Sequence, residues 1–364
     1  MAVTYSVPGT PRVYIDNFLL ARTLGMKMNI SNLRGVAESD DDEDYMYFDN
    51  DPAQSRLLWD MDPVRYNTIN SPTYDIIKLH TEFWTDDNDK PNMVAFLNLM
   101  HTSNYAAVLN HNLFSGSDQP VKVDLHYNGT AEDGGVPGTT AIVGDFGQEI
   151  TEDGFIISEI SLDGSDNGQL DQFDFIIAPS DDAIMASEFQ YKIGCFSVGT
   201  YLDFPYAPNL EVKMTYSHEG VQSKRTIAGK DLTHVSYSGA PNWGDLPPFT
   251  TTDQYNTGIN FEGAGLTGRK SWDMKFSYVD KTDMFNAVQS GSSAGIYTTG
   301  GFEETSSIIG TYLSRTLGGK LKHILQPDNT KKEFYMVKLD QKSTSITQVS
   351  PGVFDISFKF VQVW

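Results

Sequence analysis

The stretch 268–364 carries the clearest alternation of apolar and polar side chains in the chain. Its first segment, GRKSWDMKFSY, places apolar side chains at every second position from Trp272 to Tyr278. Its last segment, VFDISFKFVQVW, alternates in the same way from Phe354 to Phe360. A repeat of two residues is typical of a β-strand with one buried face. We therefore expect a half-buried strand at each end of this stretch.

The residues between these two strands predict one helix and two further strands. Apolar residues in FEETSSIIGTYLSRTLGG recur three or four positions apart, as on one face of a helix. Glu303 and Glu304 suit the positive end of the helix dipole, and Gly318-Gly319 is a typical helix stop. The segments KLKHILQ and EFYMVKLD read as strands joined by a Pro-Asp-Asn turn. The pattern predicts a small sheet covered by one helix.

Four features of this stretch are distinctive as a set. They are Trp272 and Phe276 in the first strand, the helix end TLGGKL, the turn QPDN, and the terminal ISFKFVQVW. In this order they resemble the sheet-and-helix domain of tail proteins in long-tailed bacteriophages, the distal-tail and minor-tail (baseplate hub ring) class. The resemblance covers about a quarter of the chain. Without it, the same pattern fits any α+β domain of unknown role.

The resemblance implies a structural virion protein rather than an enzyme. The chain would be one subunit of a homo-oligomeric ring, a hexamer, at the distal end or hub of the tail. It would contribute to tail-tip assembly and host adsorption, with copies of itself and other phage tail proteins as partners. It would be made in the host cytoplasm and reside in the virion tail, and it would require no cofactor.

Strand-like segments also fill residues 93–237. VKVDLHYNG alternates cleanly, and further apolar segments follow at intervals of about ten residues with Gly, Asn and Asp between them. This spacing predicts an antiparallel β-sandwich, somewhat like the jelly-roll modules of phage tail proteins. Residues 238–267 show no lasting periodicity and contain Pro241, Pro247 and Pro248, which predicts a linker.

The first 92 residues give the weakest signals. Val13 and Ile15 indicate a strand, whereas residues 28–92 predict long loops with Trp59 and Trp84 packed on a neighbouring domain or subunit. We expect residues 1–92 to pack with the domain formed by residues 268–364. The sandwich of residues 93–237 is then inserted between the two parts of that domain, and the whole chain is mainly β, of the α+β kind.

The charge of the chain narrows the choice of partners. Its 364 residues include 48 acidic and 26 basic side chains, which gives a formal charge of −22. Such a charge repels phosphate backbones and anionic lipids, so we expect no nucleic-acid partner. No apolar run approaches the roughly 20 residues that cross a membrane, so we expect no membrane insertion. The single cysteine, Cys195, excludes an internal disulfide.

The segment DGSDNGQLDQFD, residues 163–174, has the spacing of a calcium-binding loop. Its candidate ligands are Asp163, Ser165, Asn167, Asp171 and Asp174, with Gly168 at the sixth position. Oxygen ligands at alternate positions around a glycine suit a tight turn about Ca²⁺. Asp174 stands where a bidentate Glu is usual, and the flanking segments read as strands. A solvated hairpin is therefore the alternative to a calcium site.

Two weaker patterns lead to alternative functions. The aromatic residues Tyr201, Phe204, Tyr206 and Trp243 suit a platform for host surface glycans, although they would equally fill a core. They make a carbohydrate-binding or other virion surface module the second hypothesis. The letters GSSAG, residues 291–295, match a serine-hydrolase elbow. A flexible loop explains them better, because no strand-turn-helix pattern surrounds Ser293.

Overall fold

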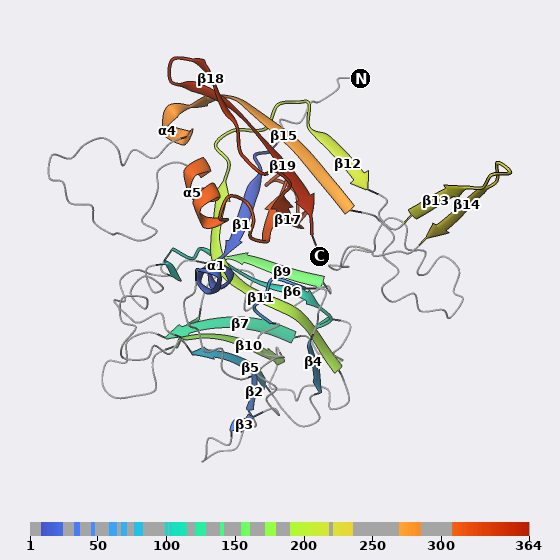
Figure 1. The fold of residues 1–364 in the computed structure, drawn as a ribbon. Helices are drawn as coiled ribbons and strands as arrows, with labels where there is room; N and C mark the ends of the chain where they lie inside the picture. The colour runs from blue at the N-terminus through green and yellow to red at the C-terminus, as the bar shows by residue number, and fades with distance from the viewer. Residues whose placement is uncertain are drawn as a thin grey trace, which may run out of the picture. The chain divides into compact units, whose positions relative to one another are not determined.

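A computed structural model of the chain shows a mainly β fold, as the sequence predicted (Figure 1). The structure describes residues 9–24, 33–36, 45–47, 58–63, 67–70, 76–82, 99–100, 102–114, 121–128, 139–141, 154–160, 172–179, 190–217, 221–235, 269–284 and 308–363. The chain divides into two compact units. Unit 1 comprises Met1–Ile15, Leu202–Tyr297 and Glu304–Trp364, and unit 2 comprises Asp16–Tyr201 and Thr298–Glu303.

The strands of unit 1 pair in antiparallel fashion around the last strand of the chain. In pairing order they are β12 (Lys213–Ser217), β15 (Arg269–Asp280), β19 (Val353–Gln362), β17 (Tyr335–Leu339), β16 (His323–Gln326) and β1 (Arg12–Asp16). β18 (Ile346–Ser350) also pairs with β19. Trp272 lies opposite Phe360, and Val13 lies opposite Leu325. Both expectations are confirmed: the last strand pairs with the strand that carries Trp272, and the N-terminal strand joins the C-terminal sheet.

One position in β15 departs from the predicted alternation. The pairing of β15 with β19 shifts between Phe276 and Val279, where a β-bulge interrupts the ladder. Tyr278 has a φ of 61° and is 76% exposed, whereas Val279 is buried. A bulge adds one residue to one strand and so reverses which side chains face inward. The prediction that Tyr278 lies on the buried face is therefore wrong.

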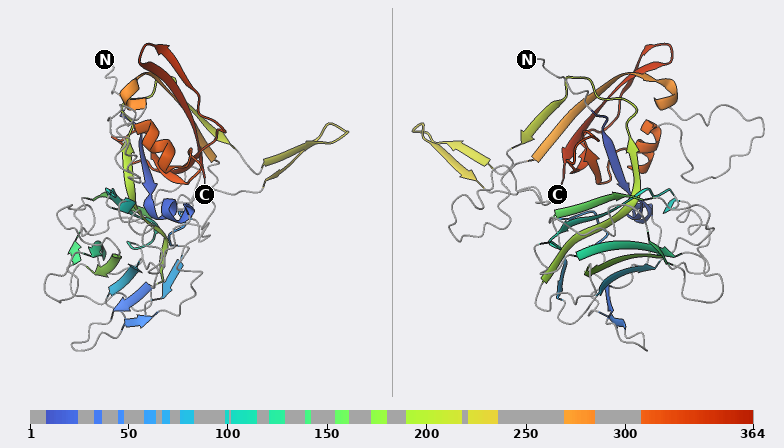
Figure 2. Two further views of the ribbon diagram at one scale, coloured as in Figure 1. Left: turned by 60° about the vertical axis from the view of Figure 1, so that its left-hand side comes forward. Right: turned by 180° about the vertical axis from the view of Figure 1, so that it is seen from behind.

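A single aromatic cluster forms the core of unit 1 beneath helix α5 (Ile308–Arg315). Tyr312 of this helix is fully buried, with its ring centroid 5.5 Å from that of Phe358 and 5.7 Å from that of Phe204. The helix ends where the glycines predicted, because Gly318 and Gly319 both have positive φ and the Gly318 N–H donates to the Leu313 carbonyl. Figure 2 shows α5 beside the long β15 and β19 ribbon from two further sides.

Unit 2 contains two antiparallel sheets. In the first, β11 (Gln190–Asp203) pairs with β6 (Tyr105–His111) and β4 (Asn67–Asn70), and β6 pairs with β9 (Gly154–Glu159). The second runs in the order β3 (Tyr45–Tyr47), β2 (Leu33–Val36), β5 (Ile76–Glu82), β10 (Gln172–Pro179), β7 (Val121–Asn128) and β8 (Thr139–Ala141). β11 itself continues into unit 1 at Leu202.

The unit boundaries differ from the predicted domains. Residues 33–82, expected to be loops that pack with the C-terminal domain, supply four strands to unit 2. Residues 202–235, expected in the sandwich, belong to unit 1, and the predicted linker lies outside the described residues. Three of the four strands, β2, β3 and β4, have only three or four residues each. Their own sequence therefore carries little periodicity.

Trp59 belongs to the core of its own unit. It is almost fully buried, with its ring centroid 4.5 Å from that of Phe18 in α1 (Asn17–Thr23) and 5.9 Å from that of Phe196 in β11. The expectation that Trp59 packs on another domain or subunit is therefore wrong, and Trp84 lies outside the described residues. Among the residues that the structure describes, no helix has the length and apolar character needed to cross a membrane.

Candidate interaction surfaces

Most of the predicted calcium loop lies outside the described residues. This holds for Asp163, Ser165, Asn167, Gly168 and Asp171. Asp174 lies in β10, where it is paired with His80 of β5 and His126 of β7. No group of three or more metal-ligating side chains occurs in the described part of the chain. The calcium site stays a prediction, flanked by strands β9 and β10 as the sequence indicated.

One of the four predicted glycan-binding aromatics is a core residue. Phe204 is only 2% exposed, and its ring stacks on Phe276 with centroids 5.1 Å apart. A ring enclosed by the core cannot face a sugar, so Phe204 is a core residue. Tyr201 belongs to unit 2 and Tyr206 to unit 1, and Trp243 lies outside the described residues.

The two remaining tyrosines each bind a carboxylate. The Tyr201 hydroxyl donates to Glu159 at 3.3 Å, and the Tyr206 hydroxyl donates to Asp283 at 2.8 Å. The hydrogen bond to Asp283 raises the pKa of Tyr206, with smaller contributions from burial and the nearby negative charge. Ser293 of the GSSAG segment lies outside the described residues.

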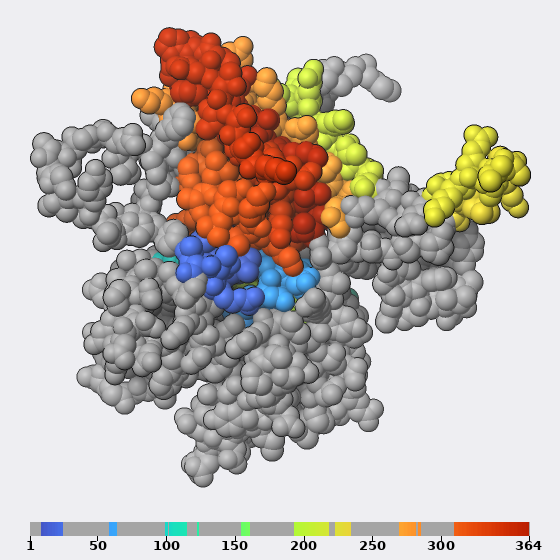
Figure 3. Space-filling view, viewed as in Figure 1, coloured from blue at the N-terminus to red at the C-terminus, as the bar shows by residue number. Residues whose placement is uncertain are grey.

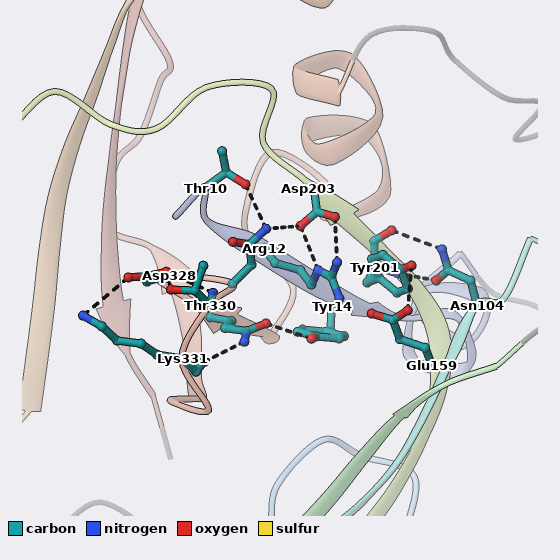
Figure 4. A network of polar contacts seen from close by, with 12 residues as sticks. Thr10, Arg12, Tyr14, Asn104, Glu159, Tyr201, Asp203, Asp328, Thr330 and Lys331 are labelled. Carbon is teal, nitrogen blue, oxygen red and sulfur yellow. Dashed lines mark hydrogen bonds and ion pairs between the residues drawn. The ribbon is translucent and has the colours of Figure 1, made fainter. Parts of the chain in front are cut away.

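The QPDN turn is fixed by the N-terminal strand through a network of polar contacts (Figure 4). The backbone N–H of Asn329 donates to the Thr10 carbonyl at 3.0 Å, and the Asn329 amide donates to the Thr10 hydroxyl at 3.0 Å. The Tyr14 hydroxyl donates to the Gln326 side-chain oxygen at 2.9 Å. The polar residues of this turn therefore hold the N-terminal strand β1 and Thr10, which precedes it, against the end of β16 and the segment that follows it.

A two-pronged ion pair extends the same network. The Arg12 guanidinium donates to both oxygens of Asp203, at 2.7 and 2.8 Å. Asn329 approaches the same carboxylate at 3.4 Å. Bidentate pairs of this kind fix geometry as well as charge. These contacts join three segments of unit 1 that are far apart in the sequence, so we assign the network a structural role.

A second buried network lies in unit 2. Asp16 caps helix α1 by accepting a hydrogen bond from the Leu19 N–H, and it accepts another from the Ser197 hydroxyl at 2.7 Å. Ser197 in turn shares a hydrogen bond of 2.8 Å with the Tyr105 hydroxyl. Burial raises the pKa of Asp16 to about 6, although the hydrogen bonds from Ser197 and the backbone oppose this shift.

This network is chemically suited to proton transfer but sterically closed. Ser197 and Tyr105 are fully buried and Asp16 nearly so. A substrate cannot reach enclosed groups, and we read the network as a structural helix cap. The sequence signal that would have found it is the Asp directly before the helical segment NFLLART.

Several exposed apolar side chains lie at or next to β12, at the edge of the unit 1 sheet. β12 pairs with β15, and no second described strand pairs with its other edge. Leu210 is 92% exposed and Met214 is 50% exposed, and Val212 and Tyr216 between and beyond them are also exposed. Leu210 and Val212 precede β12, whereas Met214 and Tyr216 lie in it, and the four occupy every second position of the sequence. Exposed edge strands with apolar side chains are templates for pairing with another chain.

The edge strand is nevertheless firmly held by its own sheet. Asn209, just before β12, donates its backbone N–H to the Lys275 carbonyl at 2.8 Å and its side-chain amide to Ser277 at 3.0 Å. The Lys270 ammonium lies 5.5 Å from the ring centroid of Tyr216 and 4.6 Å from that of Tyr335. Such cation–π contacts favour a fixed edge. Burial lowers the pKa of Lys270.

Comparison with known proteins gives no relative. No family model, no curated protein and no solved structure matches the chain.

Proposed function

We propose that this protein is a structural subunit that assembles with copies of itself into a closed ring, a hexamer, at the distal end or hub of a long bacteriophage tail. The class of particle rests on the resemblance of residues 268–364. The observation that carries the assembly is the exposed apolar edge of β12. In this role the protein contributes to tail-tip assembly and host adsorption and performs no catalysis.

The edge strand supports self-assembly for a physical reason. A strand edge presents unpaired N–H and C=O groups, and pairing them with a second chain supplies main-chain hydrogen bonds while adjacent side chains become buried. The side chains here are apolar, which favours burial. A surface on one copy that meets a different surface on the next gives a ring when the rotation per subunit closes. Each contact of a permanent ring would bury roughly 2,000 Å² or more.

The test measures the mass of the purified protein by light scattering across a salt series. The charge of −22 opposes self-association at low ionic strength, so we expect the ring to strengthen as salt screens it. The variant Leu210→Lys/Met214→Lys should shift the population to monomer. The matched control is Ile346→Lys/Val349→Lys, which adds the same charge at partly exposed apolar positions of β18.

A monomer at every salt and protein concentration would remove the ring. If that monomer also bound host glycans, the protein would be a carbohydrate-binding or other virion surface module instead. Equal loss of mass in both Lys variants would show that added charge, rather than the β12 edge, controls assembly.

A further inference from the structure

A short hairpin in unit 1 has no core of its own. It consists of β13 (Val221–Arg225) and β14 (Asp231–Val235), which pair with each other and with no other strand in the described part of the chain. Its turn is well formed, since the Thr226 N–H donates to the Lys230 carbonyl and the Gly229 N–H donates to the Thr226 carbonyl. Gly229 has a φ of +81°, a conformation that favours glycine.

Both faces of this hairpin are open to solvent. Ser223 lies opposite Thr233 on one face and Lys224 opposite Leu232 on the other, and all four side chains are exposed. Ile227, in the turn between the two strands, is fully exposed. Figure 3 shows the hairpin in yellow. An isolated two-stranded hairpin is only marginally stable in water. Contact with a partner would bury Ile227 and Leu232 and so stabilise the hairpin.

The positive charge of the hairpin indicates an acidic partner. Residues 221–235 contain three basic side chains and one acidic side chain, a charge of +2, which leaves −24 on the remainder of the chain. Arg225 lies 3.9 Å from Asp231, so the acidic side chain sits beside one of the basic ones. Lys224 and Lys230 make no ion pair with any residue that the structure describes. The hairpin therefore presents two apolar side chains flanked by two ammonium groups.

A second copy of this chain is an acidic partner by its own composition. We propose that the β13–β14 hairpin of one copy docks on the acidic surface of the next copy in the ring. This inference rests on the proposed function and adds the contact that joins neighbours. Because the hairpin is basic and its receiving surface is acidic, the two sides of the contact differ. Contacts of this head-to-tail kind are the ones that close into rings.

A polyanion such as DNA fits the hairpin less well. The net charge of −22 repels a phosphate backbone, and the two exposed apolar side chains, Ile227 and Leu232, gain nothing from phosphates. A protein surface supplies both the acidic groups and the apolar area.

The experiment compares two charge-reversal variants of the full chain. Lys224→Glu/Lys230→Glu alters the hairpin, and Lys332→Glu/Lys342→Glu alters two exposed lysines elsewhere in unit 1. Both variants carry the same net charge, so both raise the general repulsion between copies equally. Circular dichroism spectra that overlay the wild-type spectrum would show that both fold. Light scattering at increasing protein concentration then gives the concentration at which rings form.

We expect the hairpin variant to need about tenfold more protein than the control variant to assemble at low salt, because each lost surface ion pair weakens association and is replaced by repulsion. The difference should shrink as salt rises, since screening acts on exposed charges. Equal assembly of the two variants, with the wild type still a ring, would overturn the hairpin contact and leave the proposed ring intact. The hairpin contact would also be overturned if the wild type bound a DNA duplex and the hairpin variant alone lost this binding while its assembly was unchanged.

Discussion

The substitution Asp16→Asn removes a buried titratable group from unit 2 without changing its shape. Asn retains an oxygen to accept the hydrogen bond from Leu19, and its amide can donate to Ser197. Ser197 can then donate to Tyr105, because either hydroxyl of that pair can be the donor. The three side chains stay hydrogen-bonded, with the donor and acceptor roles reversed along the network. A protonated Asp16 would reverse these roles in the same way.

The magnitude follows from the two pKa values of Asp16. Its carboxyl has a pKa of about 6 in the folded protein and 3.8 in a solvated chain. Because the folded value is the higher, the folded state binds the proton more tightly. The protonated Asp16 carboxyl therefore stabilises the folded state. This stabilisation is fully present below about pH 4 and is lost as pH rises toward about 6. At about 1.4 kcal/mol for each pKa unit, the loss amounts to about 3 kcal/mol.

The assay is native-state hydrogen exchange of β6 and β11, which reports the opening free energy of unit 2. The opening free energy of Asp16→Asn minus that of the wild type should rise by about 3 kcal/mol between about pH 3 and pH 7, with about 2 kcal/mol of this rise between pH 4 and pH 6. Taking this difference cancels the titration of all other carboxylates. A flat curve for Asp16→Asn would refute the reasoning.

Three further outcomes are expected. Burial lowers the pKa of His323 to about 4, so unit 1 should lose about 3 kcal/mol of stability as pH falls from about 6.5 to about 4. Hydrogen exchange of β16 and β19 measures this loss, and His323→Gln should abolish it. Phe358→Ala should cost about 3–5 kcal/mol in urea unfolding, against less than about 1 kcal/mol for Lys359→Ala on the opposite face of β19. Calcium should raise the melting temperature of the wild type and not of Asp163→Ala; no rise at millimolar calcium would leave residues 163–174 as a plain hairpin.

The interaction surfaces were the part of the molecule least accessible to sequence reasoning. Met214 and Tyr216 are large apolar side chains in an alternating strand, and such residues usually face a core. Only the strand order shows that they lie on an edge strand and remain exposed. Residues 221–235 lie within the stretch predicted to contain strands, but that no described element covers this hairpin depends on what the rest of the chain packs against.

The sequence by itself determined the elements whose signals are local. The alternation in β15 and β19, the glycines after α5 and the turn at Asp328 depend on neighbouring residues in the chain. Apart from Tyr278 at the bulge of β15, each lies where its pattern placed it. Only the tertiary structure decided which of these surfaces are covered. Phe204 became a core residue through stacking on Phe276, and Asp16 became a titratable group of unusual pKa through enclosure beside Ser197. A periodic pattern states that a face is apolar, whereas burial, pKa and strand order depend on partners that lie far away in the sequence.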